Sequence, residues 1–130
     1  MSDLQLVKDL YAAFDRGDLD AIRSYLAADF TMNEPAGLPW SGNYAGPDGF
    51  FEFFGKLLSH VDAKVEIERI FDAGGTIVQV GHTAGTIRSN NAPFRSREVH
   101  TVVVRDSKIS RIQVYLEVDV LHAALHAPAS

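Results

Sequence analysis

The chain has 130 residues, 46% of them hydrophobic and 22% charged, which is typical of one globular domain spanning residues 1–130. Its 17 acidic and 12 basic residues give a net charge of −5, which disfavours binding to nucleic acid or anionic membranes. The absence of cysteine excludes disulfides and thiolate chemistry. The N-terminus lacks a basic, apolar leader, so we expect a cytoplasmic protein without a membrane partner.

The first half of the chain predicts three helices. A capping-box pattern at Ser2 begins a helix with one apolar stripe, and Gly17 ends it. Asp18 can cap a second, shorter helix. The run 46–48, Gly-Pro-Asp, favours a third helix start, and Phe54 lies on the broad apolar side of that helix.

The apolar residues then recur with a period of two, which predicts antiparallel strands over residues 64–71, 76–88, 94–105 and 108 to about 120. Both alternating sets of the last two strands are largely apolar, so both sheet faces should be covered. Helices can cover one face, and the other suggests a partner subunit. The sequence therefore predicts an α+β fold with an apolar pocket between the helices and a curved sheet.

Glu34 is the first candidate for a functional residue. Period-two alternation sends it to the same face as two preceding large apolar side chains. The irregular stretch 35–47 follows, and its rings Trp40 and Tyr44 could roof a cavity. A carboxylate at the mouth of an apolar pocket is one interpretation; a strand end with its carboxylate in water is the other.

Histidines in the predicted strands are further candidates. His100 shares a face with Glu98 and Val102, and a neutral imidazole there could donate a hydrogen bond to a ligand oxygen. A core histidine is the alternative. His82 is a second candidate of the same kind.

The last predicted strand leaves open which of its alternating sets faces the pocket. Tyr115 and Glu117 belong to the polar set and Leu116 to the apolar one, and a bulge would exchange them. Tyr11 could also point inward from the first helix. The spacing of histidines and acids predicts no metal site, and no cofactor motif is present.

Four segments resemble a known family: GDLDAI at 17–22, AADFTMNEPAG at 27–37, GxYxGPDGFxxFF at 42–54 and HTVVVRDSKISRIQVYLE at 100–117. They are similar to the nuclear transport factor 2-like superfamily, and more narrowly to its branch of ketosteroid isomerases and SnoaL-like polyketide cyclases. The resemblance implies a cone-shaped fold, with three N-terminal helices packed on a strongly curved antiparallel sheet that encloses an apolar pocket. It also implies a homodimer formed through the sheet.

The resemblance implies roles for individual residues. In ketosteroid isomerases an acidic base before a proline moves a proton, while a tyrosine and a protonated acid hold the enolate oxygen. Glu34 matches the base position, and His100 lies at or beside the acidic donor. The tyrosine position falls on Leu10, next to Tyr11, which argues against an authentic steroid isomerase. In SnoaL-like relatives the ligand-facing histidine and acid match His100 and Glu117.

Together these features predict a cofactor-free acid–base enzyme of the isomerase or cyclase type, acting on a small apolar, carbonyl-containing, cyclic ligand. The predicted catalytic residues are Glu34, His100 and Glu117. The predicted ligand-binding residues are Trp40, Tyr44, Phe54, His82, Tyr115, Leu116 and Tyr11. The alternatives are a non-catalytic protein that binds small hydrophobic ligands, and epoxide-hydrolase-like addition of water by Glu34, Glu117 and Arg97 or Arg111.

Overall fold

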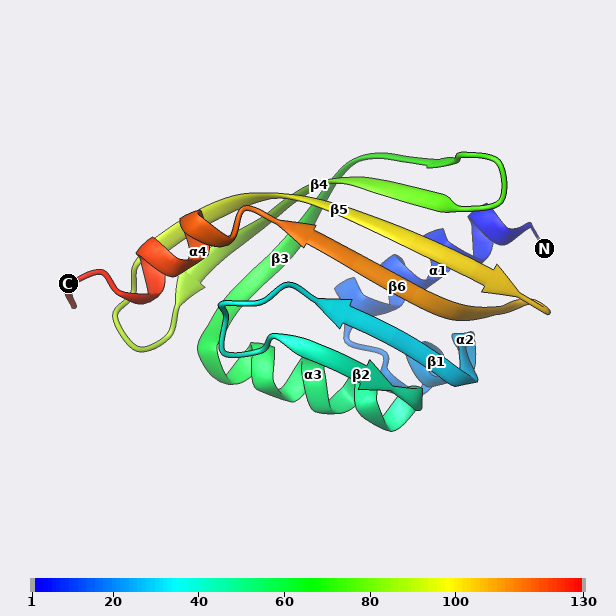
Figure 1. Cartoon of the computed structure of the whole chain (residues 1–130), viewed down its shortest axis with the longest axis horizontal. Coiled ribbons are helices and arrows are strands. Elements are labelled where there is room, and N and C mark those ends of the chain that lie inside the picture. Colours follow the sequence, from blue (N-terminus) through cyan, green and yellow to red (C-terminus); the bar gives the residue numbers. More distant parts are fainter. Residues whose placement is uncertain (1, 130) are drawn as a thin grey trace.

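The computed structural model describes residues 2–129, which form an α+β fold of four helices and one six-stranded sheet (Figure 1). None of these helices has the length and apolar character needed to cross a membrane. In chain order the elements are α1 (Asp3–Arg16), α2 (Leu19–Tyr25), β1 (Leu26–Glu34), β2 (Gly42–Ala45), α3 (Gly46–His60), β3 (Val61–Asp72), β4 (Ile77–Ile87), β5 (Pro93–Arg105), β6 (Lys108–Leu116) and α4 (Val118–Leu125).

The three predicted helices are confirmed, with their expected end signals. The Ser2 hydroxyl accepts a hydrogen bond from the backbone N–H of Gln5 at 3.0 Å and caps α1. Gly17 ends α1 in the left-handed conformation, with φ of 68°. The Asp18 carboxylate accepts from the backbone of Ala21 at 3.1 Å and caps α2.

The strand order in the sheet is β2-β1-β6-β5-β4-β3, and the sheet does not close on itself. Strands β3 to β6 are successive antiparallel neighbours, as the sequence predicts. Two features differ from the expectation of a wholly antiparallel sheet preceded by the irregular stretch 35–47. Strand β1 pairs with β6 in parallel, and residues 42–45 of that stretch form β2 against β1.

The end of the chain corrects the sequence analysis. The last strand, expected to reach about residue 120, stops at Leu116, and α4 follows. Val118, Leu121 and Ala124 recur at helical spacing, and α4 buries the last two. The sequence pattern predicts a strand here because the apolar residues Leu116, Val118 and Val120 continue the period-two alternation past the end of β6.

One face of the sheet, called the inner face here, is packed against helices, and the opposite outer face is not. Phe30 on β1 contacts Phe50 on α3, with ring centroids 6.1 Å apart, and Tyr11 on α1 contacts His100 on β5. Figure 1 shows α1 running behind β5 and β6. Because side chains alternate along a strand, Glu34, two positions from Met32 and four from Phe30, also lies on the inner face.

Gly81 is required where β3 crosses close to β4. A Cβ at this position would collide with the backbone carbonyl of Glu66 and lie 2.8 Å from the side-chain oxygen of Gln79. We therefore expect Gly81→Ala to lower the free energy of unfolding by about 2 kcal/mol, measured by urea titration. Gly55→Ala is the matched control, because a Cβ there meets nothing within 4 Å and should stabilise α3 by about 0.5–1 kcal/mol. Equal effects of the two substitutions would contradict the close approach at Gly81.

Candidate functional site

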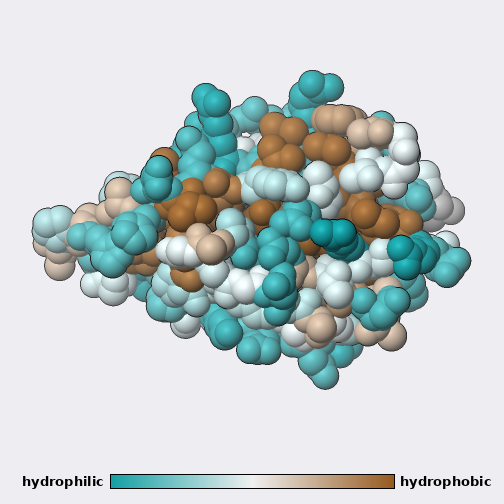
Figure 2. Space-filling model, in the orientation of Figure 1, coloured by the Kyte–Doolittle hydropathy of each residue, from teal (hydrophilic) through white to brown (hydrophobic). Residues whose placement is uncertain are grey.

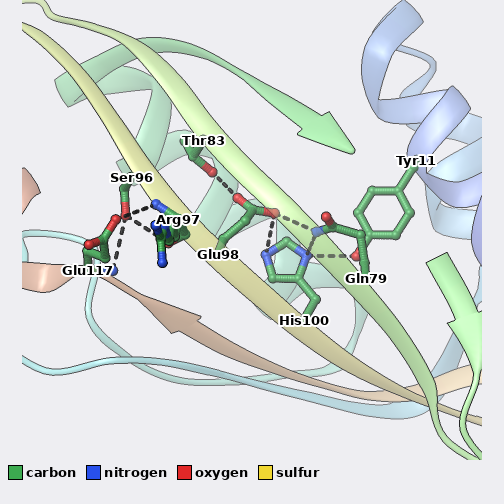
Figure 3. A network of polar contacts seen from close by, with 8 residues as sticks. All are labelled: Tyr11, Gln79, Thr83, Ser96, Arg97, Glu98, His100 and Glu117. Atoms are coloured by element: carbon green, nitrogen blue, oxygen red, sulfur yellow. Dashed lines mark hydrogen bonds and ion pairs between the residues drawn. The ribbon is translucent and has the colours of Figure 1, made fainter. Parts of the chain in front are cut away.

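A buried carboxylate lies at the centre of a polar network on the inner face (Figure 3). Glu98 on β5 is only 2% exposed. Its Oε2 accepts a hydrogen bond from Nε2 of Gln79 at 2.6 Å and lies 3.1 Å from Nε2 of His100. Its Oε1 accepts from the hydroxyl of Thr83. Three polar partners therefore compensate for the loss of water around this charge.

His100 connects this carboxylate to α1. Its Nδ1 lies 2.7 Å from the hydroxyl of Tyr11 and 3.2 Å from Nε2 of Gln79. The rings of Tyr11 and His100 stack, with centroids 5.9 Å apart and planes 12° apart. The imidazole is not sealed off, because 14% of the His100 side-chain surface is exposed. Tyr11, His100 and Glu98 thus form a continuous polar chain from the helix to the sheet.

Burial determines the protonation states of the His100 imidazole and the Tyr11 phenol. It lowers the pKa of His100, and the nearby negative charge of Glu98 opposes that change only in part. The imidazole is therefore neutral at pH 7. Burial also raises the pKa of the Tyr11 phenol; Glu98 adds to the rise and a hydrogen bond with Gln79 opposes it. Tyr11 therefore keeps its proton.

Glu34, at the end of β1, is the second buried acid, with an exposed fraction of 4%. Burial raises its pKa from 4.5 to about 8, and the charge of Glu98 adds to the rise. A hydrogen bond with the Trp40 side chain opposes it. The Tyr44 hydroxyl donates to the backbone carbonyl of Trp40 at 2.8 Å and so holds that residue in place. Glu34 is therefore largely protonated at neutral pH.

Glu98 joins these groups into one electrostatic unit. Its charge affects the pKa of Tyr11, of Glu34 and of His100. We refer to Tyr11, Glu34, Glu98 and His100 as the inner cluster. Such a group, in which burial and a second buried carboxylate raise the pKa of one acid, is typical of a site that handles protons.

Two members of this network, Glu98 and Gln79, are not among the site residues predicted from the sequence. Glu98 was recognised only as a neighbour of His100 on the same strand face, although two polar residues at positions i and i+2 of a buried strand are themselves a signal. Gln79 interrupts an apolar run in β4 and is fully buried. A polar residue in that position requires a partner, and Glu98 supplies it.

The remaining predicted residues on the helix side surround the cluster with apolar surface. Leu116 is the strand neighbour of Glu98 across β5 and β6, which settles that the apolar set of β6 faces inward. Phe54 is half-buried and contacts Phe14, with ring centroids 5.8 Å apart. Trp40 and Tyr44 are buried parts of the core rather than a roof in contact with solvent.

Three predicted site residues are not brought to the inner cluster. His82 lies on the outer face, with its Nδ1 2.7 Å from Oε1 of Glu68. Tyr115 is 54% exposed on the outer face. Glu117 is exposed because the strand has already ended, and its Oε1 accepts from the backbone N–H of Arg97 at 2.8 Å. Figure 3 shows Glu117 with Ser96 and Arg97 in a group apart from Glu98.

The arrangement needed for epoxide-hydrolase-like addition of water is not formed. Arg97 and Arg111 are exposed, and both alternate with inner-face residues, so they lie on the outer face. Glu34 lies on the inner face. The two arginines therefore cannot share one water molecule with Glu34 in this fold.

Among residues 2–129 no three histidine or acidic side chains are grouped so that they could hold a metal ion. Two open hollows of about 460 and 260 Å³ lie beside β2, and Tyr44 lines both of them. They are lined largely by exposed residues and include no member of the inner cluster. Among the buried side chains of residues 2–129, only members of the inner cluster have strongly shifted pKa values. We therefore place the candidate site at the inner cluster.

Comparisons with known proteins agree with this fold. A nuclear transport factor 2-like protein from Burkholderia thailandensis is 29% identical, with a TM-score of 0.92, and the match covers 98% of this chain and 99% of that one. A protein with a ketosteroid isomerase-like fold from Catenulispora acidiphila is 18% identical, with a TM-score of 0.79 and coverage of 95% and 93%. A Pseudomonas putida protein proposed to be a polyketide cyclase is 19% identical, with a TM-score of 0.82 and coverage of 95% and 98%.

No functionally curated protein matches the chain significantly in sequence. The model of the SnoaL-like domain matches residues 7–112, which is most of the chain. The sequence resemblance and the cone-shaped fold are therefore confirmed, and the chain belongs to the SnoaL-like domain family, within the nuclear transport factor 2-like fold.

Proposed function

We propose that the protein is a cytoplasmic, cofactor-free acid–base enzyme of the isomerase or cyclase type, acting on a small apolar, cyclic, carbonyl-containing ligand. The observation that carries this proposal is Glu34, a carboxyl 4% exposed whose pKa is about 8. A group with this pKa exchanges protons readily near neutral pH. Membership of the SnoaL-like family is consistent with isomerase or cyclase chemistry.

The surroundings of Glu34 support the choice of ligand. Met32, Val114 and Leu116 share the inner face with the cluster and favour apolar rings. Tyr11 and His100, both neutral, are the groups that could stabilise an enolate oxygen or take up a proton. Enolisation of an apolar ketone needs an acid, neutral polar groups near the carbonyl oxygen and an apolar surface around the rings, and the inner face provides all three.

The proposal is tested with two bicyclic ketones, 1-decalone and 2-tetralone, as probes. Exchange of their α-hydrogens for deuterium in D₂O is followed by NMR with and without the protein. We expect the protein to accelerate exchange, and Glu34→Gln to lower that acceleration by about 10²-fold or more. Glu52→Gln, at an exposed position on α3, is the control and should change nothing. Exchange that is unaffected by the protein or by Glu34→Gln would refute the enzymatic proposal.

A non-catalytic ligand carrier is the second candidate. It is favoured by one observation: both ring nitrogens of His100 already have partners within the protein. A carrier would bind the probe ketones, seen as a change in the fluorescence of Trp40, without accelerating deuterium exchange. Binding without exchange would therefore select this function.

We also propose that the protein forms a homodimer through the outer face. Val99 and Val103 of β5 and Tyr115 of β6 lie on this face without a covering helix. Figure 2 shows several hydrophobic groups on this side of the molecule, separated by hydrophilic residues. We expect a dimer in sedimentation equilibrium, and a monomer after Val103→Lys combined with Tyr115→Lys, because charges would be buried in the interface. A monomeric native protein would contradict the proposal.

A further inference from the structure

The orientation of the Gln79 side chain is fixed by its surroundings. Its amide nitrogen lies 2.6 Å from Oε2 of the Glu98 carboxylate. The amide oxygen in that place would put two negatively polarised atoms in contact, so the NH₂ group must face Glu98. The amide oxygen instead points toward Gly81, where a Cβ would be 2.8 Å away, and it has no hydrogen-bond partner.

The orientation of Gln79 in turn fixes the tautomer of His100. The same NH₂ group lies 3.2 Å from Nδ1 of His100, and an amide nitrogen can only donate. Nδ1 must therefore carry the lone pair, and the hydroxyl of Tyr11, 2.7 Å away, donates to it as well. The ring proton is then on Nε2, which lies 3.1 Å from the carboxylate of Glu98.

The geometry points to Glu98, His100 and Tyr11 as a proton-accepting chain in the reaction proposed above, with Glu34 of the same sheet face as the proton donor. This order of groups, with a carboxylate beside one imidazole nitrogen and a hydroxyl on the other, makes a hydroxyl oxygen a better base. The inference rests on the proposed function. It reverses the roles that the resemblance implies, in which Glu34 takes the proton and His100 donates.

The step balances within the cluster. A C–H bond next to the ligand carbonyl breaks, and its proton goes to the hydroxyl oxygen of Tyr11 while the original Tyr11 proton moves to Nδ1 of His100. The electron pair of the C–H bond stays on the ligand as an enolate, and its oxygen takes the proton of Glu34 to give an enol. The charge of Glu98 stabilises the resulting imidazolium. Return of the two protons, at the same or another carbon, completes exchange or isomerisation.

The charged and titratable groups of the inner cluster, besides His100, are Tyr11 from α1, Glu34 from β1 and Glu98 from β5, the strand of His100 itself. The facing residues of β4, Gln79 and Thr83, are uncharged. Because Glu34 gives its proton to the enolate oxygen, the reaction requires the protonated form of Glu34. The ligand is thus a ketone with an acidic C–H group, which loses a proton at carbon and gains one at oxygen in the same step.

The tautomer is tested without any ligand. Long-range ¹H–¹⁵N spectra of the histidine rings, with His100 assigned from His100→Asn, should show a protonated Nε2 and an unprotonated, hydrogen-bonded Nδ1 at pH 7. Tyr11→Phe should weaken the hydrogen bond at Nδ1 without changing the tautomer. Glu98→Gln should lower the pKa of His100, because it removes the charge that stabilises imidazolium. A proton on Nδ1 in the native protein would overturn the inference, even if the enzymatic proposal holds.

Kinetics of the deuterium exchange test the direction of transfer. The rate should fall tenfold per pH unit above about 8, where Glu34 loses its proton, whereas a Glu34 base would give a rate that rises to a plateau there. Tyr11→Phe should lower the rate at least tenfold, and Tyr25→Phe, at the end of α2, serves as the control. A rate that depends on Glu34 but increases above pH 8, or survives Tyr11→Phe, would refute the chain and leave the proposed function standing.

Discussion

Glu34→Gln is expected to stabilise the folded protein by about 5 kcal/mol above pH 8 and to change its stability little at pH 4. The pKa of Glu34 is 4.5 without the fold and about 8 within it. As the pH rises from about 4.5 to about 8, the unfolded chain ionises freely while the folded chain resists ionisation. At about 1.4 kcal/mol per pKa unit, the native protein loses that stability over this window, and glutamine has no such loss.

Urea titrations of the two proteins at pH 4, 6 and 9 measure this difference. The gap in free energy of unfolding should open between pH 4 and 9, and comparison at equal pH removes the contribution of all other groups. Glu52→Gln, on the exposed side of α3, should change stability by less than about 0.5 kcal/mol at each pH. A gap that is the same at pH 4 and pH 9 would mean that Glu34 ionises normally in the fold. If Glu34→Gln is more stable at pH 9 and also loses exchange activity, then the native Glu34 lowers the stability of the fold while it supports the reaction.

The sequence places Glu34 and His100 on a buried face of the sheet, because alternation along a strand is a local property. Each lies at an even spacing from buried residues of its own strand, and no knowledge of distant segments is needed to place it on a face. The same reasoning places Glu98, which was treated only as a companion of His100. Its importance depends on Gln79 and Thr83, which reach it from β4, and that contact depends on the register between strands.

Alternation cannot choose between two faces, and it cannot detect a parallel partner. His82 and Tyr115 were assigned toward the ligand, but registers that pair His82 with Arg97 and Tyr115 with Val99 place them on the outer face. The parallel pairing of β1 with β6 joins segments about 80 residues apart, for example Asn33 with Gln113. No local pattern in the sequence indicates such a pair.

Glu98→Leu is expected to have the opposite effect to Glu34→Gln and to lower the free energy of unfolding by about 3 kcal/mol. Leucine fills a similar volume, but it leaves Gln79, Thr83 and His100 without their shared acceptor inside the protein. Each buried donor left unpaired costs about 1–3 kcal/mol, and partial rearrangement should recover some of that loss.

Glu98→Gln separates this loss of hydrogen bonds from the loss of charge. Its amide oxygen can accept from Gln79, and its NH₂ group can face the hydroxyl of Thr83, which is able to accept. We expect urea titration at pH 5 to show a stability near that of the native protein for Glu98→Gln, and a clear loss for Glu98→Leu; Glu66→Gln, exposed on β3, is the surface control. Both Glu98 variants remove a charge that raises the pKa of Glu34, so the loss of stability between pH 4 and 9 should shrink in each. If that loss is unchanged, Glu34 and Glu98 do not interact, and the two acids are separate features of the fold rather than one site.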